Sequence, residues 1–154
     1  MMRIAQPITL PLLAFAALIF AHVVRAETIK SHMLEFAPGQ MWSVKSASPT
    51  TMKVIVGRID TAGKGQVAIH VSLIDVPIPK GMSGAGETMT IDHAPFEKAA
   101  LAASVDRLLA TNASPTPDFD TAYQQWLSAK GGIYTISVSK AVEMMFESLM
   151  RGHG

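Results

Sequence analysis

The chain has 154 residues, 49% of them hydrophobic, a formal net charge of +1 and no cysteine. Without cysteine it forms neither disulfides nor cysteine-based zinc sites, and thiol catalysis is excluded. The nearly balanced charge argues against non-specific binding to nucleic acid, which requires clustered cations.

Residues 1–26 have the pattern of a secretory signal peptide. Arg3 precedes the apolar run ITLPLLAFAALIFAHVV, and the slender side chains of Val24 and Ala26 fit a peptidase site after Ala26. We therefore expect a periplasmic or secreted protein. The alternative is a retained membrane anchor, because the 17 residues from Ile8 to Val24 approach the length of a spanning helix. A proline and a histidine within the run favour cleavage.

Cleavage would leave 128 residues with 11 basic and 12 acidic groups, a net charge of −1. A chain of this length buries a core without disulfides. We expect a loose lead-in over residues 27–38 and a single domain over residues 39–151. Neither a nucleic-acid partner nor stable membrane insertion after cleavage is expected.

Alternating apolar and polar residues predict four strands in the first part of the domain. In the third of them Val67, Ile69 and Val71 alternate with Ala68 and His70. A loop rich in proline and glycine is expected over residues 75–87. The four predicted strands comprise residues 40–46, 51–60, 66–75 and 88–93.

The spacing of apolar residues then changes to that of a helix. A first helix is predicted over residues 95–111, beginning at Pro95, with Leu101, Val105 and Leu108 on its apolar face. Thr116 and the proline after it predict the start of a second helix that ends near residue 131. Residues 131–138 are expected to form a fifth strand, and a last helix is expected from about residue 139.

The predicted order of elements is ββββααβα, which indicates an α+β fold. We expect an antiparallel sheet of four to five strands with about three helices packed on one face, because parallel pairing would need a helix between consecutive strands. The other face would carry Ser43, Lys45, His70 and Ser72, and would be wet or bind a ligand.

Asp92 and His93 stand where the fourth predicted strand meets the first predicted helix. In a functional interpretation His93 is a general base or metal ligand that Asp92 orients. Neighbouring residues of a strand project to opposite faces, so we expect the two side chains not to cooperate. We favour a structural role, in which one of them caps the helix that begins at Pro95. Binding of an anion at the helix N-terminus is the alternative.

A metal site shared by His70 and His93 is also not expected. If Ile69, Val71 and Ile91 face one core, His93 points toward the core and His70 points outward. A slip of the strand register by one residue would unite them but would bury polar residues of the fourth strand. The methionines of the last predicted helix fit core packing better than copper binding. We expect no cofactor and no metal.

No catalytic residue is identified, and the residues that remain as ligand-binding candidates are Asp92, His93, His70, Lys45 and Trp42. We expect an exported non-enzymatic module that binds a protein partner in the cell envelope, of the inhibitor, immunity or accessory type. The alternative is a small-molecule binding domain or hydrolase centred on Asp92 and His93.

Several short motifs follow the strand that contains Trp42, in the order IDHAPF, SVDRL, YQQW and GGIYTIS. As a set, over roughly residues 39–145, they resemble a group of small uncharacterised bacterial exported proteins with no established activity. The resemblance implies a bacterial origin and hence the periplasm as a destination. It implies no catalytic residue.

Overall fold

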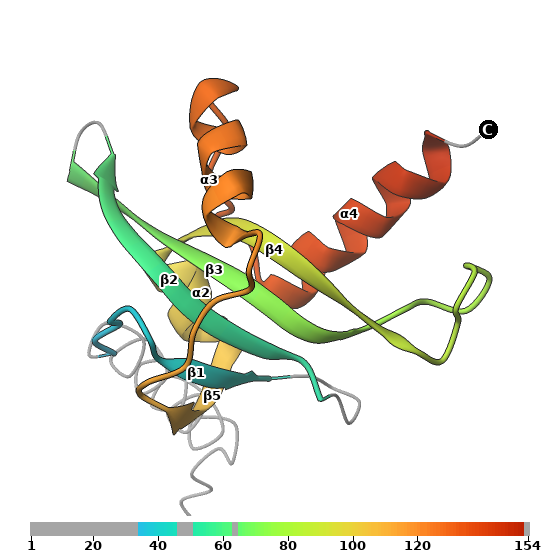
Figure 1. Ribbon diagram of the computed structural model, residues 1–154, viewed down its shortest axis with the longest axis horizontal. Coiled ribbons are helices and arrows are strands. Elements are labelled where there is room, and N and C mark those ends of the chain that lie inside the picture. Colours follow the sequence, from blue (N-terminus) through green and yellow to red (C-terminus); the bar gives the residue numbers. More distant parts are fainter. Residues whose placement is uncertain (1–33, 46–50, 63–64, 153–154) are drawn as a thin grey trace, which may run out of the picture. The chain divides into compact units, whose positions relative to one another are not determined.

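The computed structural model describes residues 34–45, 51–62 and 65–152, so the expected signal peptide lies outside the described residues. The described chain forms a five-stranded antiparallel sheet in the order β4-β3-β2-β1-β5, together with three helices (Figure 1). The strands are β1 (Met41–Val44), β2 (Lys53–Ala62), β3 (Gln66–Pro77), β4 (Thr88–Glu97) and β5 (Val105–Ala110). The helices are α2 (Lys98–Ser104), α3 (Phe119–Ser128) and α4 (Val138–Arg151). The predicted α+β class is confirmed.

The hydrophobic core lies on one face of the sheet. Val56 and Val71 occupy facing positions on β2 and β3, and both are completely buried. Leu101 of α2 and Ala141 and Phe146 of α4 belong to the same buried cluster. The alternation that predicted the strands therefore also identified the face that α2 and α4 cover. Leu34 and Phe36, from the expected lead-in, pack against this core as well.

Helix α3 lies on the opposite face, whereas we expected the helices on one face. Tyr123 of α3 donates a hydrogen bond to Asp60 of β2, which projects away from the core. Phe119 lies so close to Gly57 that a Cβ atom there would be 2.4 Å from the ring. In Figure 1, α2 lies behind β2 and β3, and the segment that enters α3 crosses in front of them. Consequently the face expected to be wet is partly covered.

The predicted helix over residues 95–111 is wrong at both ends. Strand β4 continues to Glu97, and the helix occupies only Lys98–Ser104. The residues that follow form β5, whose Val105 and Leu108 pair with Val44 and Trp42 of β1. Leu101 and Val105 are buried, as the helical spacing required, but pairing with a distant strand overrides that local preference.

The strand predicted over residues 131–138 is also absent from the described sheet. Within this segment Tyr134 alone makes a β-bridge, parallel to Phe96 of β4. The observed order is therefore ββββαβαα. It differs from the predicted order by the exchange of one strand and one helix. The last helix begins at Val138, one residue before the expected start, and Ser137 caps it by accepting a hydrogen bond from Lys140 N.

Two bulges interrupt the hairpin that β3 and β4 form. Between the pairs Val71–Ala94 and Leu73–Ile91, β4 has one residue more than β3. Farther along the hairpin β3 has the additional residue, in the part that contains Asp75, whose φ is 55°. Each bulge reverses the alternation of side chains beyond it.

Among the described residues no helix is both long enough and apolar enough to cross a membrane.

Candidate functional site

The first bulge places His93 on the same face of the sheet as His70, contrary to the predicted separation. Ile91 and Ala94 both face the core although they are three positions apart, so His93 between them faces away from it. Nδ1 of His70 lies 2.9 Å from Nε2 of His93, a hydrogen-bonding distance. The register slip that we considered unfavourable occurs only locally, and it leaves the apolar residues of β4 on the core side.

Asp60 and Tyr123 extend this contact into a chain of polar groups. The Tyr123 hydroxyl donates a hydrogen bond of 2.7 Å to Oδ2 of Asp60. The same oxygen lies 3.4 Å from Nε2 of His70. His70 is completely buried, and its Nε2 has no hydrogen-bond partner within the described part of the chain. We refer to Asp60, His70, His93 and Tyr123 as the histidine cluster.

Aromatic side chains of α3 enclose the two imidazole rings. The rings of His70 and His93 stack with centroids 5.1 Å apart. Trp126 lies 4.8 Å from His70 and 5.7 Å from His93, and Phe119 lies 5.7 Å from His93. The Arg58 guanidinium, 4.7 Å from the Tyr123 ring centroid, covers the outer side of that ring. This packing buries His70 completely and His93 in part.

Burial decides the protonation state of the histidine cluster. Desolvation lowers the pKa of His70, and the negative charge of Asp60 only partly opposes this effect. Desolvation, together with the neighbouring His70, lowers the pKa of His93 to about 4. The hydrogen bond to Asp60 raises the pKa of Tyr123. At neutral pH both imidazoles are therefore uncharged.

The Asp60 carboxylate selects the tautomers of the two neutral rings. A proton on Nε2 of His70 faces this carboxylate favourably, which leaves Nδ1 of His70 as an acceptor. His93 then donates from Nε2, and its Nδ1 keeps a lone pair. No described residue forms a hydrogen bond with that nitrogen. The arrangement therefore presents one unprotonated nitrogen on a partly buried ring.

Asp92 is not part of this chain of contacts. Its backbone oxygen accepts a hydrogen bond from Ser72, whose Oγ also lies 3.2 Å from the Thr116 hydroxyl. Its carboxylate forms no hydrogen bond or ion pair with a residue that the structure describes. The predicted capping role is wrong for both members of the pair. Helix α2 begins at Lys98 and its N-cap is Glu97, so neither Asp92 nor His93 caps it.

The other two candidates lie apart from the histidine cluster. Trp42 is buried in the core face of β1, where its Nε1 donates to the side chain of Gln40 and its ring contacts Phe36. Lys45 is exposed just after β1, and its backbone N–H bonds to Ser104. Of the five candidates, the structure brings only His70 and His93 into contact.

Sequence reasoning did not identify Asp60, Tyr123 and Trp126 as neighbours of the histidines. Tyr123 and Trp126 lie on the apolar stripe of the second predicted helix, a pattern that indicates burial but not polar contacts. Asp60 stands two positions after Arg58 on a strand, a weak indication that both face the same side. Asp60 and Tyr123 are 63 positions apart, and no pattern in the sequence predicts their contact.

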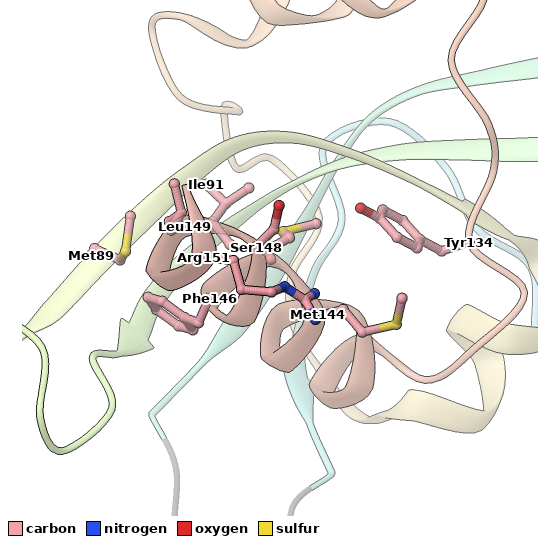
Figure 2. A pocket seen from close by; sticks show the side chains of 9 residues that line it. Met89, Ile91, Tyr134, Met144, Phe146, Ser148, Leu149 and Arg151 are labelled. Atoms are coloured by element: carbon pink, nitrogen blue, oxygen red, sulfur yellow. The ribbon is translucent and has the colours of Figure 1, made fainter. Parts of the chain in front are cut away.

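A second feature is an apolar pocket of about 550 Å³ between β4 and α4 (Figure 2). We call it the α4 groove. Two of its lining residues, Met144 and Leu149, are 46% exposed, and the adjacent Met150 is 51% exposed. Arg151 is its one charged lining residue within the described structure. The groove is lined by Met89, Ile91, Tyr134, Met144, Met145, Phe146, Ser148, Leu149 and Arg151.

The described residues contain no group of three or more histidine, aspartate or glutamate side chains arranged to hold a metal ion. No family model, curated protein or solved structure matches the chain.

Proposed function

We propose that this chain is an exported, non-enzymatic module that binds a protein partner in the cell envelope through the α4 groove. The observation that carries the proposal is the exposure of large apolar side chains around a pocket of about 550 Å³. Contiguous exposed apolar surface is typical of interaction sites. Export is supported by the sequence of residues 1–26.

The residues of the groove are suited to contact with another protein. Met144 and Met145 have flexible, polarisable side chains that adapt to different apolar surfaces. Tyr134 and Arg151, residue types that are enriched in binding hot spots, lie at the same site. On the exposed side of α4, Lys140 pairs with Glu143, which supplies a polar border to the apolar patch.

A photocrosslinking amino acid at position 144 tests this proposal. With the crosslinker in place of Met144, irradiation of cells should join the protein to one defined partner in the envelope. The matched control carries the crosslinker in place of Arg107, which is exposed on β5 at the opposite edge of the sheet. Equal labelling from both positions, or none from position 144, would contradict the proposal.

A second candidate function is small-molecule binding or hydrolysis at His93. The observation in its favour is the ordered series Tyr123, Asp60, His70 and His93, which leaves a lone pair on one nitrogen of His93. A neutral imidazole nitrogen of this kind can accept a hydrogen bond or a proton from a bound molecule. Replacing His93 with glutamine should then abolish ligand binding or turnover while Tm stays nearly constant. A fall in Tm without a ligand effect would assign His93 a structural role.

A further inference from the structure

We propose that the α4 groove binds the apolar C-terminal segment of a partner protein, which adds to β4 as an extra strand and places its terminal carboxylate at Arg151. This inference rests on the proposed function and specifies the part of the partner that is recognised. It combines three separate features of the structure: an open sheet edge, an apolar floor and a single cationic group.

The open edge belongs to β4, the outermost strand of the sheet. At its C-terminal end this edge is occupied, because Tyr134 N donates to Pro95 O and Glu97 N donates to Tyr134 O, each at 2.9 Å. Toward Thr88 no described residue pairs with the outer side of the strand. Backbone groups on such an edge are available to an extended peptide. The Tyr134 bridge sets the limit of the added strand.

The apolar floor continues from the strand to the helix. Met89 and Ile91 pair with the core residues Val76 and Leu73, so both face the side of the sheet that α4 covers. A strand added beside them would direct every second side chain onto Met145 and its neighbours on α4. The bound segment should therefore carry apolar residues at alternate positions.

The charge of the groove indicates what the end of the segment carries. Arg151 is paired only loosely, with its nitrogen 4.0 Å from a Glu147 oxygen, and the pair is solvent-exposed. The hydroxyls of Tyr134 and Ser148 supply two further donors, and Figure 2 shows the Tyr134 hydroxyl directed toward the side of α4 that carries Ser148. A guanidinium and two hydroxyls that line the same apolar pocket complement one carboxylate. An apolar peptide with a free C-terminal carboxylate therefore matches both the apolar residues and the single positive charge of the α4 groove.

A library of random hexapeptides with free C-termini, screened against the purified protein, tests the inference. Enriched peptides should have alternating apolar residues, and their C-terminal amides should bind at least tenfold more weakly in fluorescence anisotropy. N-methylation of backbone amides on one edge of the peptide should abolish binding. Arg151→Gln should remove the preference for the free acid, Arg151→Lys should retain part of it, and Arg107→Gln should leave it unchanged.

Other outcomes distinguish the alternatives. No enrichment, or equal affinity for acid and amide, would overturn the inference. Displacement of the peptides by dodecanoate together with insensitivity to N-methylation would assign the groove to a fatty acid instead. A partner that crosslinks at position 144 while no C-terminal peptide is enriched would leave the proposed function intact and refute only this mode of binding.

Discussion

The two faces of the β3–β4 hairpin are covered to different extents by helices. On one side α3 covers the histidine cluster so fully that His70 has no exposed surface. On the other side α4 leaves Met144 and Leu149 nearly half exposed beside the edge of β4. The polar groups of the histidine cluster are therefore largely enclosed, whereas flexible apolar groups around the α4 groove remain accessible. This difference indicates that the first region stabilises the fold and the second is suited to binding.

The largest change in stability is expected for Phe119→Ala. The Phe119 ring is almost completely buried between β2 and His93, so its loss should lower the free energy of unfolding by about 3–5 kcal/mol. The matched substitution in the groove, Met144→Ala, should change it by about 0.5 kcal/mol or less, because the side chain is exposed. Urea denaturation of both variants measures the difference. Similar losses in the two would remove the distinction between the regions.

The next largest effect is expected for Gly57→Ala. A Cβ atom at this position would be 2.4 Å from the Phe119 ring, so the buried ring, or α3 with it, must shift away from the sheet. Overpacking of this kind should cost about 3 kcal/mol, at the upper end of its usual range. Combining Gly57→Ala with Phe119→Leu should recover part of the loss in thermal unfolding. If the single variant is as stable as the wild type, α3 does not lie as close to β2 as described.

Acidification should lower the free energy of unfolding through the histidine cluster. Burial lowers the pKa of His93 to about 4 and also lowers that of His70, so the unfolded chain binds protons more readily than the folded chain. The stability from the neutral rings is complete above about pH 6.5 and is lost as pH falls toward 4. Allowing for solvent screening of the partly exposed His93, the loss should be about 2 kcal/mol.

The control for the acid effect is His93→Gln, measured over the same pH range by chemical denaturation. Glutamine keeps a polar partner for His70 but does not titrate. The slope of stability against pH between 6.5 and 4 should therefore decrease in the variant. An unchanged slope would show that other groups, not His93, cause the acid sensitivity.

The smallest effect is a gain, expected for Lys130→Gly. Lys130 follows α3 with a φ of 50°, a left-handed conformation that glycine adopts without steric cost. Its backbone N–H bonds to Leu127 O, so the conformation terminates the helix. The substitution should raise the free energy of unfolding by about 0.5–1 kcal/mol, and thermal unfolding will show it. A loss of stability would mean that the Lys130 side chain contributes to the attachment of α3.

The sequence predicted those parts of the fold that depend on local alternation. β2 and β3 were recognised because Val54, Val71 and their neighbours alternate regularly and face one core. β5 was predicted as a helix because Leu101, Val105 and Leu108 also fit helical spacing, and only pairing with β1 decides between the two. Such pairing joins residues more than sixty positions apart and has no local signature.

The candidate site was predicted only in part, for a similar reason. His70 and His93 were identified as candidates, but strict alternation placed them on opposite faces. The bulge that unites them is defined by the register of two strands, and nothing in the residues 91–94 specifies it. Asp60 and Tyr123 reach the histidines through tertiary packing, which a single sequence does not show.

The two bulges of the β3–β4 hairpin have a consequence for how its length can change. Each adds one residue to a different strand, so their effects on register cancel, and Val71–Ala94 and Val76–Met89 pair in a common frame. Deleting Asp75 or Asp92 alone would remove one bulge and leave the other, which absorbs the unequal number of residues on the two strands. Deleting both would give an uninterrupted ladder with every core residue still inside. The hairpin therefore has two positions at which it can lose a residue without moving an apolar side chain out of the core.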